Sequence, residues 1–378
     1  MEAEIFVVDN NSTDGAKEYL SEKFSSVIFT WNRKNEGFGK ACNSILTKTS
    51  GNYILFLNPD TIVGEDCFEK CISFMQAHNH CGALGVRMID GTGKFLKESK
   101  RSFPHPFTSF YKMVGFSALF PQSKLFARYY AGQLPENENN PVEVLSGAFM
   151  LLSKKAIEIT GGFDEDFFMY GEDIDLSYRI QKAGMQNWYF AGTSILHFKG
   201  ESTKKLSAAY IEHFYGAMKI FAKKHYSQNK KTFFLLITAI AAAKALAVVK
   251  MKWSNKKAAH VLQNKPLLTA IAAGQQQFNE CLLIIKHTKP AVVLCGRIGL
   301  SQNDTINVLG NIAYAEKLVK DNKIDQLVFC EGNLSFKSII ETMQKIPRNI
   351  TMLVHAAKSD SMAGSNNKNT KGFFIAKP

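Results

Sequence analysis

Apolar and polar positions along the first 200 residues predict strands and helices in turn. Short apolar runs, typical of buried strands, cover residues 4–9, 26–31, 52–58, 81–90, 144–153, 186–192 and 194–198. Amphipathic stretches between them predict helices at 13–24, 37–49, 65–78, from 154 onward and at 174–183. This alternation predicts a mostly parallel sheet covered on both faces. Ligands bind such sheets beyond the carboxyl ends of the strands, where Asp9 and Asp60 lie.

Residues 100–145 interrupt this alternation. They are rich in aromatic residues and proline and include the polar loop "PENENNPVE" at 135–143. We expect an insertion here that faces a substrate, because irregular segments on an α/β scaffold commonly carry binding functions.

The pattern changes again after residue 210. The run "TFFLLITAIAAAKALAVV" at 232–249 is apolar except for its threonines and Lys244. As a helix its 18 positions span about 27 Å, slightly short of a hydrocarbon core of about 30 Å. The run could cross a membrane, lie in the interface as an anchor, or be a buried helix. We favour the interfacial anchor, because Lys244 lies inside the run and charge is costly within a membrane.

A second alternation begins at Pro290. Strands are predicted at 291–296, 325–332 and 349–357, with helices at 304–322 and 335–346, and the polar segment 359–372 is expected to be irregular. The stretch "CGRIGLS" at 295–301 lacks the spacing of a dinucleotide-binding loop. We therefore predict a small Rossmann-like α/β unit of unknown role.

Composition and charge add to this picture. With 46% hydrophobic and 21% charged residues, the 378-residue chain is globular and not disordered. The net charge of +13 is concentrated between Lys199 and Lys257, where 13 lysines face only Glu201 and Glu212. A concentrated basic region predicts a polyanionic partner, either nucleic acid or an anionic membrane. Nucleic acid is disfavoured, because these lysines flank an apolar run and do not alternate with exposed aromatic residues.

Cysteine usage and the start of the chain concern the compartment. The seven cysteines form no CxxC pair and no spacing with histidine suited to zinc, which indicates reduced thiols in the cytosol. The first nine residues are patterned as a strand, so we expect no secretory signal at this end.

Three polar clusters are candidates for chemistry, each with a plain alternative. "VVDNNSTDG" (7–15) puts an acid at a strand end but is also an ordinary strand–turn–helix corner. "LFLNPDT" (55–61) puts Asp60 where it could bind a hard cation, although Asn-Pro is also a common turn. "FFMYGEDIDLSYRIQKAG" (167–184) carries three acids behind an aromatic run. They suit either a helix start, with Asp173 as N-cap and Asp175 in the first turn, or a general base beside apolar rings.

Taken together, the clusters resemble the inverting family-2 glycosyltransferases, especially the rhamnosyltransferase-like branch that builds bacterial surface polysaccharides. The resemblance covers roughly residues 4–205. Its matching segments are "VVDNNSTDG", "NEGFGKACN" (35–43), "LNPDT", "SGAFMLLSKKA" (146–156), "GGFDEDFFMYGEDIDLSYRIQKAG" (161–184) and "ILHFKGEST" (195–203). The family's pattern begins with a further strand and helix ahead of the segment that starts here at Glu4. The resemblance therefore implies a catalytic domain whose first strand is missing.

The resemblance implies a Rossmann-like nucleotide-diphospho-sugar transferase (GT-A) fold and three parts. These are a catalytic domain at 1–210, a basic helical membrane-associating segment at 211–289, and the α/β unit at 290–378.

It also implies roles for individual residues. Asp173 matches the family's catalytic base, and Glu172 accompanies it in the Glu-Asp motif. Asp60 occupies the final position of the Asp-x-Asp metal motif, whose first acid is Asn58 here, and His197 would complete a Mg²⁺ or Mn²⁺ site. The substrate-binding residues implied are Asp9, Asn10, Asn35, Gly37, Asn43, Asn58, Gly147 and Asp175.

The expected function is metal-dependent, inverting transfer of a sugar from a nucleotide-diphospho-sugar to a saccharide acceptor, lipid-linked in this branch. We expect the protein at the cytoplasmic face of a bacterial plasma membrane, bound to anionic lipid by its basic segment. The alternative is a catalytically impaired glycosyltransferase-like binding or scaffold protein, suggested by the missing strand.

Overall fold

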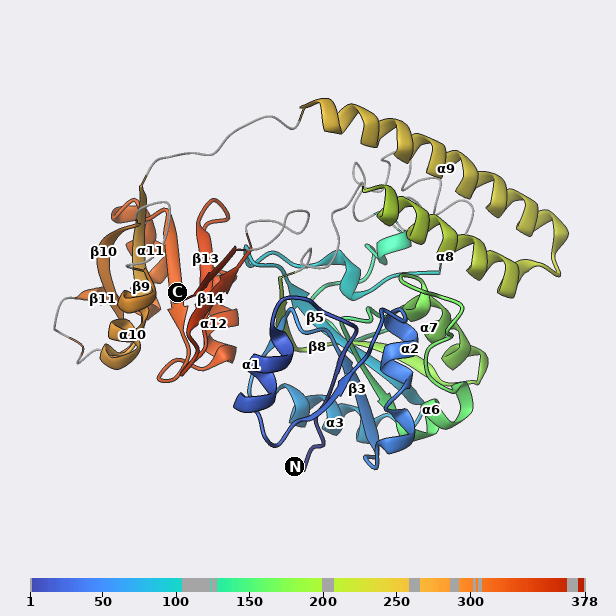
Figure 1. The fold of residues 1–378 in the computed structure, drawn as a ribbon, viewed down its shortest axis with the longest axis horizontal. Coiled ribbons are helices and arrows are strands. Elements are labelled where there is room, and N and C mark those ends of the chain that lie inside the picture. The colour runs from blue at the N-terminus through green and yellow to red at the C-terminus, as the bar shows by residue number, and fades with distance from the viewer. Residues whose placement is uncertain are drawn as a thin grey trace.

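The computed structural model describes residues 2–103, 128–198, 207–257, 266–285, 292–301, 308–365 and 373–376, with Ser123 and Asp304. The chain forms three parts: an α/β body up to residue 198, a pair of long helices, and a second α/β unit (Figure 1). Half of the predicted insertion at 100–145 (residues 104–122 and 124–127) lies outside the described residues. So do residues 199–203 of the segment "ILHFKGEST", together with Lys204 and Lys205.

The body contains two sheets. Strands β1 (Phe6–Asp9) and β2 (Ile28–Trp31) pair in parallel and, within the described residues, form a sheet of their own. The larger sheet has the order β3-β7-β5-β8-β4, with β6 also paired to β8. Its strands are β3 (Tyr53–Leu57), β4 (Thr61–Val63), β5 (Cys81–Ile89), β6 (Asn140–Val142), β7 (Phe149–Ser153) and β8 (Gln186–His197).

The α/β class is confirmed, but the larger sheet is mixed instead of mostly parallel. Only β5 and β8 run parallel in it, and β3–β7, β5–β7, β4–β8 and β6–β8 are antiparallel pairs. A parallel neighbour requires a long crossover connection, usually a helix. β7 instead starts at the end of the sheet where β3 and β5 finish, and therefore runs antiparallel to both.

Helices cover both faces of the larger sheet. One face buries β5 and β7 residues with Cys67, Cys71 and Met75 of α3 (Cys67–Ala77). On the other face, the alternate residues of β3, β5 and β7 are buried under α6 (Lys154–Thr160) and α7 (Glu172–Lys182). Phe38 of α2 (Phe38–Asn43) packs against the same cluster. The remaining helices of the body are α1 (Ala16–Lys23) and the 3₁₀ turns η1 (Leu46–Lys48), η2 (Lys97–Ser99) and η3 (Arg128–Tyr130).

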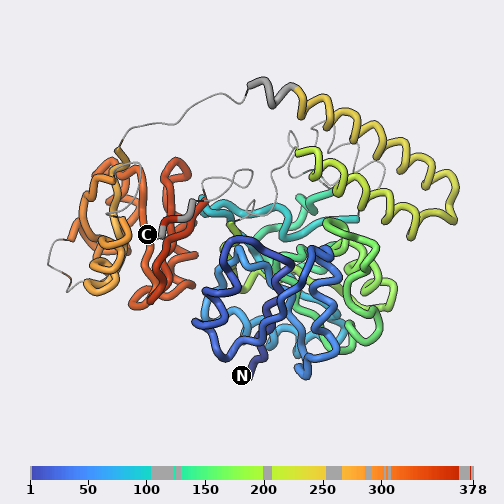
Figure 2. The backbone as a smooth tube through the Cα atoms, in the orientation of Figure 1, coloured from blue at the N-terminus to red at the C-terminus, as the bar shows by residue number. Residues whose placement is uncertain are grey.

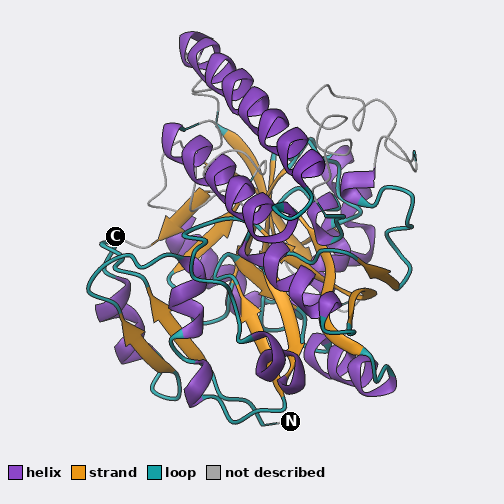
Figure 3. Ribbon diagram, turned by 90° about the vertical axis from the view of Figure 1, so that its right-hand side faces the viewer, coloured by secondary structure: helices purple, strands orange, loops and turns teal. Residues whose placement is uncertain are grey.

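Two long helices follow, α8 (Ala208–Tyr226) and α9 (Lys230–Lys257), which lie side by side (Figure 3). Leu236 and Ile240 of α9 pack against Ala222 of α8. The 230–252 stretch of α9 is long and apolar enough to cross a membrane by length and composition, and only 11% of its most apolar window is buried. The buried-helix alternative for this segment is therefore wrong.

The second α/β unit is a seven-stranded sheet in the order β11-β10-β9-β12-β13-β14-β15. The first five strands are parallel, and the last two are antiparallel. The strands are β9 (Leu267–Ala272), β10 (Val292–Gly299), β11 (Val308–Asn311), β12 (Gln326–Cys330), β13 (Thr351–His355), β14 (Ser361–Gly364) and β15 (Phe373–Ala376). Its helices are α10 (Gln275–Ile285), the 3₁₀ turn η4 (Ile312–Tyr314), α11 (Ala315–Asp321) and α12 (Phe336–Met343).

Three sequence predictions in this unit require correction. The segment 359–372, expected to be irregular, contains β14, which pairs with β13 and β15. The sheet of the unit begins at β9, inside the segment assigned to the helical region, because β9 pairs with both β10 and β12. The predicted helix 304–322 is a strand in its first half, where β11 pairs with β10, and is helical only from η4. Figure 2 shows this second unit, in orange to red, beside the body, in blue to green.

Candidate active site

The candidate residues lie together where the strands of the larger sheet end, a place that we call the strand edge. Leu57, the last residue of β3, pairs with Phe149, the first residue of the antiparallel strand β7. β5 is antiparallel to β7 and parallel to β8, so the carboxyl ends of β3, β5 and β8 meet at the amino end of β7. The predicted segments after β3 and before β7, and His197 at the end of β8, therefore lie at this edge.

Asp60 and His197 form a close pair. The carboxylate Oδ1 of Asp60 lies 3.2 Å from Nε2 of His197, and both side chains are largely buried. The pairing of β4 with β8 sets this geometry, because Thr61 lies opposite His197 and the backbone N–H of Phe198 donates to the carbonyl of Asp60 at 3.0 Å. The structure thus places the two predicted metal ligands together.

The Asp60–His197 pair fits a hard or borderline divalent cation. One carboxylate oxygen and one imidazole nitrogen converge, and Nδ1 of His197 is buried with no hydrogen-bond partner among the described residues. Within those residues no group of three or more His, Cys, Asp or Glu side chains is arranged to hold a metal. The described protein atoms therefore provide two ligands, and the remaining positions would fall to substrate and water.

The acidic cluster starts helix α7. Tyr170 and Gly171 adopt positive φ angles of 69° and 85°, and the helix begins at Glu172 with Gly171 as its N-cap. Glu172, Asp173 and Asp175 all lie in the first turn, where the helix dipole favours negative charge. The capping alternative is thus correct in part, with glycine instead of Asp173 as the cap.

Asp173 faces the strand edge. Its Oδ2 accepts from Nη2 of Arg101 at 2.5 Å and from the backbone N–H of Gly147 at 3.2 Å, while Oδ1 accepts from the N–H of Ile174. Burial lowers the pKa of Arg101, but the charge of Asp173, the hydrogen bond to it, and the charges of Tyr129 and Glu98 together outweigh burial, so the pKa of Arg101 is raised. Arg101 was not predicted from the sequence, because it lies in an irregular segment without a motif.

Glu172 lies next to Asp173 but in a different environment. Burial, and then the charge of Asp173, raise the pKa of Glu172 to about 8. Its Oε2 is buried without a hydrogen-bond partner in the described part of the chain. Near neutral pH this carboxyl is therefore mostly protonated, and Asp173 is the member of the pair that faces Arg101.

Asp175 points away from the edge, because residues i and i+2 of a helix do not share a face. It is fully buried between α7 and α8, where Oδ1 lies 2.6 Å from Nε2 of His225 and Oδ2 accepts from Nε of Arg179 at 2.6 Å. This places Asp175 in helix packing and not in the predicted substrate-binding position.

The predicted nucleotide-binding residues lie at the ends of β1 and β2. Asn10 donates to Asn35 Oδ1 at 2.8 Å and to the carbonyl of Gly37 at 3.1 Å, and Asn35 accepts from the N–H of Gly37. Asp9 accepts from the N–H of Ser12 at 2.9 Å. Gly37 has a φ of 89°, and a Cβ there would lie 2.6 Å from the carbonyl oxygen of Phe168. The glycine thus allows this loop to pack against the segment that precedes α7.

Asn43, Asn58 and Gly147 have distinct positions. Asn43 donates to the carbonyl of Phe163 and accepts from its N–H, so it joins α2 to the loop before α7 and does not face the edge. The backbone N–H of Asn58 donates to the carbonyl of Ala148 at 3.0 Å. That bond, with the one from Gly147 to Asp173, links the Asp60 loop to the start of α7.

Comparison with known proteins gives a consistent result. Residues 1–159 match the family model described as glycosyl transferase family 2. The chain is 27% identical over 234 residues to N-acetylglucosaminyl-diphospho-decaprenol L-rhamnosyltransferase of Mycobacterium tuberculosis, covering 59% of this chain and 75% of that protein. It is 26% identical over 184 residues to rhamnosyltransferase WbbL of Escherichia coli, covering 47% of this chain and 65% of that protein.

Similar solved structures include two of S. aureus TarS. One has 15% identity and a TM-score of 0.37, and the match covers 58% of this chain and 34% of that chain. The other, residues 1–349, has 14% identity and a TM-score of 0.39, with coverage of 64% and 61%. This chain thus spans only about a third of the longer TarS structure.

Proposed function

We propose that this chain, whose residues 1–159 belong to glycosyl transferase family 2, transfers a sugar from a nucleotide-diphospho-sugar to a hydroxyl of a saccharide acceptor with inversion. The observation that supports this best is the shared strand edge, where the Asp60–His197 pair and Asp173 are joined through Asn58, Ala148 and Gly147. A transferase requires both a site for the leaving diphosphate and a base for the acceptor.

The reaction is a single displacement. The acceptor oxygen forms a bond to the anomeric carbon, the bond from that carbon to the diphosphate breaks, and the acceptor proton passes to a carboxylate oxygen of Asp173. Arg101 and the N–H of Gly147 hold Asp173 at the edge before the proton arrives. Burial, and then the charge of Asp173, raise the pKa of Glu172 to about 8, so Glu172 is mostly protonated near neutral pH and we assign the base to Asp173 instead.

Mg²⁺ or Mn²⁺ held by Asp60 and His197 would supply positive charge that stabilises the departing diphosphate. We assign the nucleoside to the end of β1, where hydrogen bonds connect the segment after β1 to the segment after β2. The residues concerned are Asp9, Asn10, Asn35 and Gly37. For the acceptor we favour a saccharide linked to a polyprenyl diphosphate, because the Mycobacterium tuberculosis relative is named for such an acceptor.

The test is release of nucleoside diphosphate by the purified protein with Mn²⁺ and a panel of nucleotide sugars. We expect turnover by the unaltered chain and a loss of about a hundredfold or more in Asp173→Asn, because the amide cannot accept the proton. Asp166→Asn, an exposed change in the loop before α7, is the matched control and is expected to retain activity. Equal turnover by Asp173→Asn would reject Asp173 as the base.

One observation favours a second function, nucleotide-sugar binding without turnover. Each oxygen of Asp173 already accepts a hydrogen bond, and one oxygen pairs with the Arg101 charge at 2.5 Å. Arg101 would have to move before an acceptor hydroxyl could take its place on this oxygen of Asp173. Titration calorimetry that shows metal-dependent nucleotide binding, together with no product in the release assay, would support this alternative.

We also propose that α9 anchors the protein at the cytoplasmic face of an anionic bacterial membrane. Phe234, Leu235, Leu246 and Val249 are exposed on this helix, and lysines flank its apolar stretch. Leu235→Asp is expected to weaken binding to phosphatidylglycerol vesicles about tenfold or more. Ile159→Asp, an equally exposed position on α6, should have little effect. Wild-type vesicle binding by Leu235→Asp would reject the anchor.

A further inference from the structure

The second α/β unit shares a hydrophobic core with the strands that carry the Asp60–His197 pair. Leu196 and Phe198, on either side of His197, are buried with Ile339 and Met343 of α12 in one cluster. Ile62, two residues after Asp60, packs against the same cluster. Both residues of the pair are therefore flanked by side chains that insert into the second unit.

A polar contact joins the same segment to α12. The carboxylate of Glu65 accepts from the backbone N–H groups of Phe336 at 2.6 Å and Lys337 at 3.1 Å, at the amino end of that helix. Asp66 pairs with the Lys337 ammonium at 2.8 Å. The segment after β4 is therefore held against α12 by a helix cap and an ion pair.

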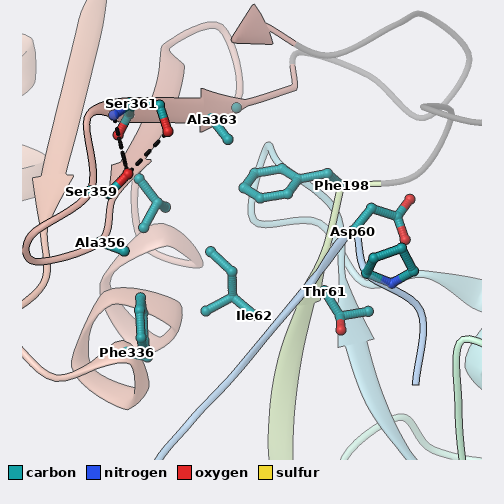
Figure 4. A pocket seen from close by; sticks show the side chains of 12 residues that line it. Asp60, Thr61, Ile62, Phe198, Phe336, Ala356, Ser359, Ser361 and Ala363 are labelled. Carbon is teal, nitrogen blue, oxygen red and sulfur yellow. Dashed lines mark hydrogen bonds between the residues drawn. The ribbon is translucent and has the colours of Figure 1, made fainter. Parts of the chain in front are cut away.

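The contact also builds the surroundings of Asp60. A cavity of about 380 Å³ lies between the two parts, lined by Asp60, Thr61 and Phe198 on one side and by Phe336, Ser359 and Ser361 on the other (Figure 4). Asp60 thus lies where the body and the second unit meet.

The β4 strand depends on this support. It is three residues long, lies at the edge of the sheet order, and pairs with β8 alone among the described strands. A short edge strand has few backbone hydrogen bonds to hold its register. α12 packs against both β4 and β8, and the Glu65 carboxylate joins the segment after β4 to the amino end of that helix.

We infer that the second α/β unit fixes the positions of Asp60 and His197, with Glu65 and Ile62 as positioning residues, so that divalent-cation affinity depends on this unit. The inference rests on the proposed function for the identity of the ligand, and it assigns a role to a unit outside the residues matched by the family model. Groups that orient metal ligands without touching the metal typically change affinity by about 10–100-fold when removed.

The first experiment measures Mn²⁺ affinity in the full chain by titration calorimetry. Glu65→Ala is expected to weaken binding about tenfold, and Glu65→Gln, which keeps one acceptor oxygen, should restore part of the loss. The matched control is Asp325→Ala, which removes a carboxylate that accepts the backbone N–H of Leu268 at 3.1 Å, at the amino ends of β9 and β12 and thus at the opposite end of these strands from the cavity. Wild-type affinity in Glu65→Ala, or an equal loss in Asp325→Ala, would overturn the inference.

A second measurement does not depend on metal. Hydrogen exchange without Mn²⁺ should become about tenfold faster at Thr61–Val63 and Ile195–His197 in Glu65→Ala, and should stay unchanged in Asp325→Ala. If the unaltered chain binds no Mn²⁺ but exchange still rises, the metal part of the proposed function fails while the positioning role is supported. Unchanged exchange in both Glu65→Ala and Glu65→Gln would refute the positioning role, whatever the metal result.

Discussion

The helical pair and the second α/β unit contact different halves of the candidate site. The helical pair does so partly through polar contacts, and the second unit mainly through an apolar core. The helical pair contacts α7, which carries Asp173, through a small apolar cluster and through polar contacts such as Asp175–His225. The second α/β unit contacts β4 and β8, which carry Asp60 and His197, through a larger shared core. Both attachments are close to the proposed chemistry.

The difference predicts different responses to perturbation. Apolar burial is non-directional, so the shared core should couple the body and the second unit into one unfolding transition. A buried polar contact requires both partners, so replacing Asp175 alone should remove the contribution of the Asp175–His225 contact between α7 and α8 to stability. The four predictions below test this contrast, from the largest expected effect to the smallest.

The largest effect is expected in the shared core. Leu196→Ala removes a fully buried side chain between the body and the second unit, and should lower the free energy of unfolding by about 4 kcal/mol. Chemical denaturation followed by far-ultraviolet circular dichroism measures the change. Leu246→Ala, at an exposed position of α9, is the control and should shift it by less than about 0.5 kcal/mol in aqueous buffer. A loss in Leu196→Ala as small as in this control would show that the core does not couple the two parts.

The contact between α7 and α8 should give the next effect. Asp175→Asn leaves His225 and Arg179 without the carboxylate that both contact, and should cost about 3 kcal/mol of unfolding free energy. The same denaturation experiment measures it, with Asp166→Asn as the exposed control. If Asp175→Asn and His225→Ala show additive losses in a double-mutant cycle, the two groups are not coupled and the contrast is broken.

Glu172 gives a pH-dependent effect on the same helix. Because burial raises its folded-state pKa to about 8, above the ordinary value of 4.5, the folded chain binds its proton more tightly than the unfolded chain. This contribution is full below about pH 4.5 and is lost as the pH rises through 8. Glu172→Gln should therefore lose less stability between about pH 7 and pH 8.5, by about 1–2 kcal/mol. Parallel pH profiles for the two proteins would contradict the assignment.

The sequence predicted much of this arrangement. The alternating apolar runs located most strands and helices of the body, and acids at strand ends pointed to one edge. Pairing Asp60 with His197, 137 positions apart in the chain, came from resemblance to a family and not from periodicity. The structure brings them within 3.2 Å through the β4–β8 register.

Other features had no local signal or a misleading one. Arg101 carries no motif, and only the fold brings it to Asp173. Asp175 resembles its acidic neighbours in sequence, but helix geometry turns it toward His225. The strand β9, "LLTAIA" between Pro266 and Gly274, was missed beside a longer helical run although its short apolar pattern was visible. The contact of Glu65 with α12 joins residues about 270 positions apart and is set by tertiary packing alone.

The smallest effect is expected where α8 meets the loop before α7 at the surface. Lys224 contacts Asp164 and Asp166, but its side chain and that of Asp166 are 30% and 69% exposed, so water screens the pairs. Lys224→Met should cost only about 0.5 kcal/mol, and the cost should shrink further in 1 M salt. Thermal unfolding at low and high salt measures it, with Lys320→Met on the exposed pair of α11 as the control. A loss as large as that of Asp175→Asn would mean that surface charge, and not the buried Asp175–His225 contact, holds the helical pair in place.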